Sequence, residues 1–408
     1  MKIIKASYVV TVDENFNIIE DGAVVFNEKI IEVSKASIIL EKYPNLEVIE
    51  LDKNSVLMPG LVNSHIHLEF SANKTTLKYA NFYSWLNSVI KHREKLIEKA
   101  TSSLITQELN KILKTGTTTI GAISSYSFDL QSCVNSKINT RFFCEAIGSK
   151  ADMVDTLFSD FKARLNDALK FSSKNFSVGV AIHSPYSVHP FLVREVLNLA
   201  REKNLPVTSH FLESKEEKEW LLKDEGSFVE FFKNFLNQTK ANSKPFEFLN
   251  LFKNIKHLSF THCVEANKDE LELIKELNAT INHCVVSNRF LNNSRLNLEN
   301  LEDIDFSIGT DGLSSNNSLS MFDELRACLM AHYEKDIIKF SKTLIHSATV
   351  NGAKALGFES KGRIKQDFDS DMICFNLPDK IEDIEDIYMN IILHTKYVSK
   401  VVIGGEFV

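Results

Sequence analysis

Two histidines, His65 and His67, stand one residue apart at the end of a short apolar stretch that reads as a β-strand. Side chains alternate along a strand, so residues i and i+2 point to the same side and can bind one metal ion. Such a pair alone is a weak indicator, because His-x-His pairs are also common in exposed loops. Similar residues end later apolar runs, namely His183, His210, His262 and Asp311. We interpret the set as one metal-dependent enzyme site.

The elements that must position these residues are short apolar strands followed by longer amphipathic helices, which is typical of parallel βα units. The sequence predicts strands over 61–68, 117–123, 140–147, 178–183, 206–211, 258–262, 279–284 and 306–309. Eight such units favour an α/β fold with a closed (β/α)₈ TIM-type barrel. The active site of this barrel lies at the carboxyl ends of its strands. Each candidate falls at such an end, so a set of unrelated buried histidines is improbable.

Both ends of the chain have a pattern that differs from this alternation of strands and helices. Residues 1–58 contain β-branched runs separated by turn residues, which is typical of hairpins, and β patterns return near the carboxyl terminus. We expect 1–58 and 357–408 to form a small β-sandwich domain together, and 59–356 to form the metal-dependent catalytic barrel.

Composition narrows the class of partner. The chain has 408 residues, is 44% hydrophobic and 25% charged, and carries a formal charge of −7 without a basic block. This argues against nucleic acid or an anionic membrane surface as a partner and favours a small molecule. No apolar stretch approaches the length of a membrane span. The six scattered cysteines suit reduced thiols in the cytoplasm. The oligomeric state stays open, and a homo-oligomer is compatible with the sequence.

Across nearly its whole length the chain resembles the amidohydrolase superfamily, within it the mononuclear-metal branch of nucleoside deaminases. The motifs that carry the resemblance are Pro-Gly-Leu-Val-Asn-Ser-His-Ile-His at 59–67, His-Ser-Pro-Tyr-Ser at 183–187, His-Phe-Leu-Glu at 210–213, Thr-His-Cys at 261–263, Ser-Asn at 287–288, and Gly-Thr-Asp-Gly-Leu-Ser-Ser-Asn-Asn at 309–317. In combination these motifs are highly specific.

The resemblance implies that four residues bind one divalent metal ion, with zinc preferred over ferrous iron: His65, His67, His210 and Asp311. Three imidazoles and a carboxylate suit either metal. A second metal is not expected, because the fourth strand ends in His183 where a bridging lysine would be needed. Glu213, His262 and Asp311 are implied to be catalytic, with Glu213 carrying a proton to a purine ring nitrogen. The alternative for Glu213 is membership of the charged, solvated run 214–219.

The resemblance also implies substrate-binding residues. His183 is placed to contact the purine, and Trp85 and Glu94 stand where relatives keep a tryptophan and a ribose-binding glutamate. An ordinary exposed position is the alternative for Glu94. Arg141 and Arg289 are candidates for holding a substrate carboxylate.

Some features depart from the commonest relatives. His-Cys-Val-Val at 283–286 replaces a His-Cys-Pro pattern, and a phenylalanine-rich segment covers 228–252. The aromatic spacing is more typical of a core, although it could also line a pocket. These features are similar to the aminodeoxyfutalosine deaminases of the futalosine route to menaquinone, which implies conversion of 6-amino-6-deoxyfutalosine to futalosine and ammonia. The alternatives are a methylthioadenosine or S-adenosylhomocysteine deaminase, a guanine deaminase, a triazine chlorohydrolase, and a non-catalytic scaffold.

Overall fold

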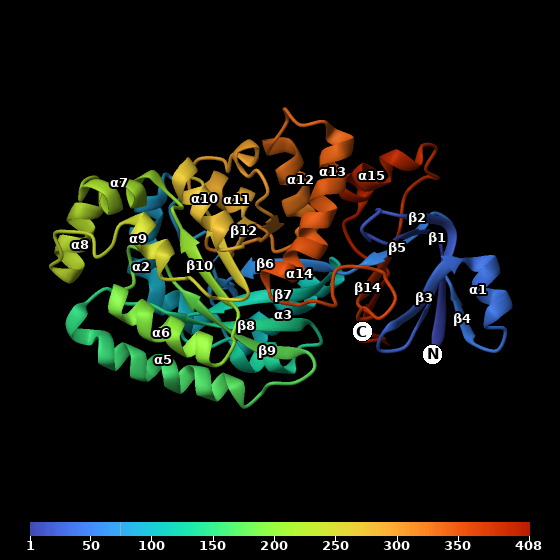
Figure 1. The fold of residues 1–408 in the computed structure, drawn as a ribbon, viewed down its shortest axis with the longest axis horizontal. Coiled ribbons are helices and arrows are strands. Elements are labelled where there is room, and N and C mark those ends of the chain that lie inside the picture. Colours follow the sequence, from blue (N-terminus) through green and yellow to red (C-terminus); the bar gives the residue numbers. More distant parts are fainter. Residues whose placement is uncertain (74) are drawn as a thin grey trace.

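The computed structural model describes residues 1–73 and 75–408, and most of it is an eight-stranded parallel barrel (Figure 1). The strands pair in chain order: β6 (Leu61–Ile66), β7 (Thr117–Ser124), β8 (Asn139–Ala146), β9 (Phe176–Ile182), β10 (Val207–Phe211), β11 (Leu258–His262), β12 (Thr280–His283) and β13 (Phe306–Ile308). The backbone N–H of Asp311 donates to the carbonyl of His65 at 3.0 Å, and the Ser64 hydroxyl donates to the carbonyl of Ile308 at 2.9 Å. These bonds join the last strand to the first, and the predicted (β/α)₈ fold is confirmed.

Helices cover the outside of the barrel. They are α2 (Phe82–Lys99), α3 (Ser102–Lys114), α4 (Leu130–Asn135), α5 (Val154–Leu169), α6 (Pro190–Glu202), α10 (Lys268–Glu276), α11 (Val285–Phe290), α12 (Met321–Ala331), α13 (Ile337–His346) and α14 (Gly352–Ala355). Several begin at a side chain that accepts a backbone N–H, as Asn81 does before α2 and Thr101 before α3. Among the described residues, no helix is long and apolar enough to cross a membrane.

The phenylalanine-rich segment 228–252 forms α8 (Phe228–Leu236) and α9 (Pro245–Asn250), which follow α7 (Lys215–Lys223) between β10 and β11. These helices lie on the side of the molecule away from the two chain termini (Figure 1). Most of the segment's phenylalanines, among them Phe228, Phe232 and Phe252, are buried in the main hydrophobic core. The core interpretation of this segment is therefore confirmed. Phe228 lies behind Tyr186, with ring centroids 5.1 Å apart, so the segment supports a residue that faces the site.

The two ends of the chain form a second sheet beside the barrel (Figure 1). Its strands are β1 (Lys2–Val10), β2 (Ile18–Phe26), β3 (Ile30–Lys35), β4 (Glu47–Glu50), β5 (Ser55–Pro59), β14 (Met372–Asn376), β15 (Lys400–Ile403) and β16 (Glu406–Phe407). Their order is β16-β15-β14-β5-β1-β2-β3, with β4 also paired to β1. The helix α1 (Ala36–Lys42) follows β3. The predicted β structure built from both termini is confirmed.

This second sheet directly supports the barrel strand that carries the His-x-His pair. β5 passes into β6 through Gly60, whose N–H donates to the carbonyl of Asp371 at 3.0 Å. A Cβ on Gly60 would lie 2.1 Å from the hydroxyl oxygen of Thr118, so only glycine fits there. One hydrophobic cluster contains Tyr8 and Met58 of the sheet, residues of α12 and α13, and the helix α15 (Ile387–His394). The sheet and the barrel therefore share a core that fixes the start of β6.

Candidate active site

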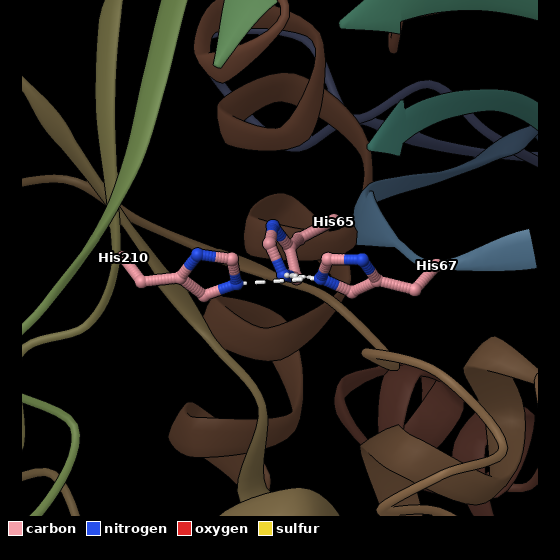
Figure 2. A group of neighbouring side chains, drawn as sticks. All are labelled: His65, His67 and His210. Carbon is pink, nitrogen blue, oxygen red and sulfur yellow. Dashed lines mark hydrogen bonds between the residues drawn. The ribbon is translucent and has the colours of Figure 1, made fainter. Parts of the chain in front are cut away.

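Three imidazole nitrogens converge inside the carboxyl end of the barrel (Figure 2). The Nε2 atoms of His65 and His67 are 3.1 Å apart, and those of His67 and His210 are 3.3 Å apart. His65 and His67 come from the end of β6, and His210 comes from β10. All three side chains are buried. The structure therefore brings three predicted ligands together from strands on different sides of the barrel.

Asp311 faces two of these nitrogens. Its Oδ1 lies 3.5 Å from Nε2 of His67 and 3.8 Å from Nε2 of His65. The hydroxyls of Ser287 and Ser315 donate to its Oδ2 at 2.7 and 2.8 Å. Burial alone would raise the pKa of Asp311, but His67 and His262, together with the Ser287 hydrogen bond, bring this pKa below its ordinary value. Asp311 is therefore held through both oxygens, since the Gly312 N–H donates to Oδ1 at 2.9 Å, and Oδ1 also faces the histidines.

The donor set fits a divalent metal ion. Nδ1 of His210 donates to the carbonyl of His183 at 2.7 Å, so its Nε2 carries the free lone pair. Nδ1 of His65 lies 3.2 Å from the Thr261 hydroxyl. Burial lowers the pKa of His210 to about 4 and that of His65 well below its ordinary value, so both stay neutral. Neutral imidazoles and a carboxylate are the ligands that zinc and ferrous iron take in proteins.

Glu213 and His262 lie beside this cluster. Nε2 of His262 is 3.6 Å from Oε1 of Glu213, and its Nδ1 is 2.9 Å from Oδ1 of Asn288. Within the described residues, Nε2 of His262 has no hydrogen-bond partner although it is buried. Burial, reinforced by the negative charge of Asp311, raises the pKa of Glu213 well above its ordinary value. A carboxyl with a raised pKa and an open ring nitrogen therefore face the space beside the ligands.

The backbone around these residues is strained. Leu212, His262 and Asp311 have positive φ angles of 46°, 73° and 58°. Non-glycine residues with such angles cost on the order of 1–3 kcal/mol each and persist only where the surrounding structure holds them. All three lie at or just past the ends of strands β10, β11 and β13. The strain is concentrated where the side chains must leave the strand direction to meet at the site.

A cavity of about 100 Å³ opens next to these groups. Its polar lining comes from the candidate site, and its apolar lining includes Phe70, Phe82, Trp85, Leu86, Val89 and Tyr186. The Trp85 indole N–H donates to the carbonyl of Ser314 at 2.8 Å. His183 also lines the cavity, and burial lowers its pKa to about 3, so this ring is neutral. A ligand with one apolar side and polar groups directed at the histidines and carboxyl groups suits such a lining.

The structure does not bring three of the sequence-predicted residues to this cavity. Glu94 is exposed on α2. Arg141 is the third residue of β8, at the amino end of the barrel, and its Nε donates to the carbonyl of Leu356 at 2.9 Å. Arg289 is exposed on α11. The predictions that Arg141 or Arg289 holds a substrate carboxylate, and that Glu94 holds a ribose, therefore have no support in the geometry of the site.

Several residues that support the site were not predicted from the sequence. Ser287 and Asn288 belong to a motif noted there, yet neither was assigned a partner. Glu69 follows His67 at the next i+2 position and is buried, accepting backbone N–H groups from Ser125, Tyr126 and Phe128. The repeated spacing of His65, His67 and Glu69 is a signal that could have identified it.

A second group of possible ligands, His283, Cys328 and His332, lies buried between β12 and α12. Nε2 of His283 is 3.1 Å from Nε2 of His332. If both Nε2 atoms bound a metal, both Nδ1 atoms would carry hydrogens, and neither has a hydrogen-bond partner within the described chain. A single hydrogen bond between the two rings leaves fewer unsatisfied donors. We therefore assign no metal to this group.

Comparison with known proteins agrees with the fold described above. The Amidohydrolase family matches residues 56–408 of this chain. The chain is similar to an aminodeoxyfutalosine deaminase of a Nitratiruptor species, with 46% identity over 406 residues that cover 100% of this chain and 99% of the relative. It is also similar to an adenosine deaminase of Helicobacter pylori, with 33% identity over 412 residues and 99% of each chain covered.

Among solved structures, the chain resembles the Helicobacter pylori aminofutalosine deaminase in complex with methylthio-coformycin. The TM-score is 0.95, the identity is 33%, and 100% of each chain is covered. The likeness therefore includes both the barrel and the terminal sheet.

Proposed function

Because this chain belongs to the amidohydrolase family, a family of hydrolytic enzymes, we propose that it deaminates a 6-aminopurine nucleoside, with 6-amino-6-deoxyfutalosine as the substrate. The products are futalosine and ammonia, as a step of menaquinone biosynthesis. The observation that carries the proposal is the 46% identity, over the full length, to a relative named for this activity. The complete set of His, Glu and Asp groups at the site supports an enzyme rather than a scaffold.

The reaction replaces the amino group on purine C6 by an oxygen from water. A C–O bond forms, the C–N bond breaks, and ammonia leaves. A divalent metal ion held by His65, His67, His210 and Asp311 would supply a polarised water molecule of lowered pKa. We propose zinc for this metal, and the three nitrogen donors and one oxygen donor are compatible with it.

The remaining steps belong to the side chains around the cavity. Glu213 would donate its proton to the ring nitrogen next to C6, which makes this carbon more electrophilic. His262 would accept a hydrogen bond from the attacking water through its open Nε2 and so orient the water oxygen toward C6. Glu213, now ionised, would take one proton of the attacking water and return to its starting state, and Asp311 would take the other and pass it to the departing amine. Burial raises the pKa of Glu213, which favours a carboxyl that can donate a proton, and lowers the pKa of His262, which favours a neutral ring.

The cavity lining contains two of the residues that the sequence predicts to bind the substrate. The His183 and Trp85 side chains both border the cavity and would contact the purine and its ribose. The Nδ1 of His183 lies 2.6 Å from the Ser187 hydroxyl, which holds the ring in place.

A methylthioadenosine or S-adenosylhomocysteine deaminase is the second candidate. One observation favours methylthioadenosine, whose 5′ methylthio group is uncharged, because no arginine or lysine of the described chain lines the cavity. A neutral, apolar 5′ substituent therefore also suits the side formed by Trp85, Leu86 and Val89.

Ammonia release by the purified, metal-loaded enzyme would decide between the candidates. The four nucleosides to compare are aminodeoxyfutalosine, methylthioadenosine, adenosylhomocysteine and adenosine, and the quantity is kcat/KM. We expect the highest kcat/KM with aminodeoxyfutalosine, by about tenfold or more if its aryl carboxylate gains one charge-assisted contact. Equal or higher efficiency with methylthioadenosine would overturn the substrate assignment and keep the reaction type.

We also propose a cytoplasmic location, which the six free, buried cysteines support.

A further inference from the structure

Glu217 is a buried carboxylate inside a run of charged residues. It lies in the first turn of α7, and none of its surface is exposed. Its neighbours Lys215 and Glu219 are exposed, as expected for a charged helix. Burying a carboxylate is costly unless hydrogen bonds compensate it. The bonds that Glu217 makes are therefore the reason for its position.

Both oxygens of Glu217 bind the turn that carries the candidate proton donor. Oε2 accepts the backbone N–H of Glu213 at 2.7 Å, and Oε1 accepts the backbone N–H of Leu212 at 3.2 Å. These two peptide groups directly follow β10, which holds His210. The Leu212 φ of 46° shows that the backbone there is strained. One carboxylate thus holds two consecutive N–H groups of a strained turn.

This arrangement differs from an ordinary capping box. Ser214 is the N-cap of α7, and its hydroxyl accepts the N–H of Glu217 at 3.1 Å. In a capping box, the glutamate at the third helical position reaches back to the N-cap N–H. Here it reaches past the N-cap to the two preceding residues instead. The start of α7 is thereby tied to the active-site turn.

The helix that carries Glu217 is firmly anchored. Trp220 and Leu221, one turn further along α7, are fully buried. The Trp220 ring stacks on Phe232 of α8, with centroids 4.8 Å apart and planes 9° apart. On the other side of the turn, the Leu212 carbonyl accepts the N–H of Glu265 at 3.1 Å. The Leu212–Glu213 turn is therefore held on one side by Glu217 of the anchored helix and on the other side by the N–H of Glu265.

We propose that Glu217 is a positioning residue, which holds the Leu212–Glu213 turn so that the Glu213 carboxyl faces the reacting purine. The role in catalysis rests on the deaminase function proposed above, whereas the hydrogen-bonded clamp itself does not. Glu217 touches no substrate and acts only through Glu213. Displacement of a catalytic group by about 1 Å can lower a rate by about 10²-fold. Loss of the clamp should therefore reduce turnover far more than substrate binding.

Glu217→Gln is the appropriate variant because it keeps the size and shape of the side chain. A carboxylate offers acceptors to both N–H groups, whereas an amide offers one oxygen and must turn its NH₂ toward the other donor. Glu219→Gln, at an exposed position of α7, is the matched control.

A double-variant cycle on kcat tests the functional part. We expect Glu217→Gln to lower kcat about 10- to 100-fold, with metal content unchanged and KM changed less than about threefold. The same change made in a Glu213→Gln enzyme should lower kcat no further, because residues that act as a unit are not additive. An equal fold loss in both backgrounds would show that Glu217 acts elsewhere and would overturn the proposal. The Glu219→Gln enzyme should match the wild type.

Hydrogen exchange tests the clamp without any substrate. Amides at 212–213 should exchange about tenfold faster or more in Glu217→Gln than in wild type, while those of β11 stay unchanged. Unchanged exchange at 212–213 would overturn the clamp. If none of the nucleosides is turned over but the exchange result holds, the proposed function fails and the clamp survives.

Discussion

Asn288 fixes the ring of His262: the Oδ1 of Asn288 lies 2.9 Å from Nδ1 of His262 and accepts its hydrogen. The other nitrogen of His262 then points toward Glu213 and the cavity without a partner in the described chain. Asn288 is itself buried on α11, after β12. One amide therefore determines both the tautomer and the direction of a candidate catalytic imidazole.

Removal of this acceptor should impair chemistry and spare binding. We expect Asn288→Leu to lower kcat about 10- to 100-fold, the range found for residues that orient a functional imidazole. Asn288→Asp keeps an oxygen acceptor at the same place and should retain more activity. Steady-state kinetics on the best substrate would measure both variants. If the Leu variant were as active as wild type, His262 would not depend on Asn288.

Asp311→Asn should nearly abolish activity and reduce metal binding. An amide in place of the carboxylate loses the charge, and its NH₂ would meet the hydroxyl donors of Ser287 and Ser315 or the imidazole cluster. Elemental analysis of the purified wild-type protein should give one divalent metal per chain, and removal of it by a chelator should abolish activity reversibly. Two tightly bound metals per chain would contradict the assignment of the His283 group, and full activity of the variant would contradict the role of Asp311.

Arg141→Met should leave the order of substrate preference unchanged and lower the melting temperature. The guanidinium donates to the Leu356 carbonyl and lies 4.6 Å from the Phe358 ring centroid, at the amino end of the barrel. Loss of a hydrogen bond from a charged group costs about 1.5–3 kcal/mol of the free energy of unfolding. Arg289→Met, at an exposed position, should change neither quantity. Thermal unfolding and the nucleoside panel measure the two effects, and a changed preference in Arg141→Met would restore its substrate role.

Glu324 should make the protein less stable as pH rises. Burial raises its pKa to about 8 from the ordinary 4.5, while its oxygens accept the N–H of Val286 and the Asn316 amide. A raised folded-state pKa contributes stability that is complete below about pH 4.5 and is lost as pH rises toward 8. The loss is at most about 1.4 kcal/mol per pH unit for this one proton.

Urea unfolding of wild type and Glu324→Gln between about pH 5 and pH 8 would measure this effect. The wild-type free energy of unfolding should fall more steeply with pH than that of the variant, which cannot ionise. Parallel slopes for the two proteins would mean that Glu324 does not release a proton in this range.

The sequence by itself determined the barrel and the set of groups at its centre. Short apolar runs that end in a His or Asp can be recognised in the sequence because parallel strands alternate with helices along the chain. The carboxyl ends of all barrel strands meet at one face, so these residues are expected to lie together. The six strand-end residues could therefore be grouped although they are spread over most of the barrel sequence: His65, His67, His183, His210, His262 and Asp311. No knowledge of their distances was needed for that step.

Only the tertiary structure decided which neighbouring residues serve the site. Arg141 belongs to a correctly predicted strand, but its height along β8 places it at the opposite end of the barrel from the cavity. Glu94 was assigned by its distance from His67 along the chain, yet the rotation of α2 turns it to solvent while Trp85 and Val89 face inward. Glu217 stands in a charged run that reads as solvated, and its burial depends on two backbone N–H groups made available by a strained turn. Side-chain type and spacing predict a face or a strand end, whereas height, helix rotation and unpaired backbone donors are set only when the elements pack.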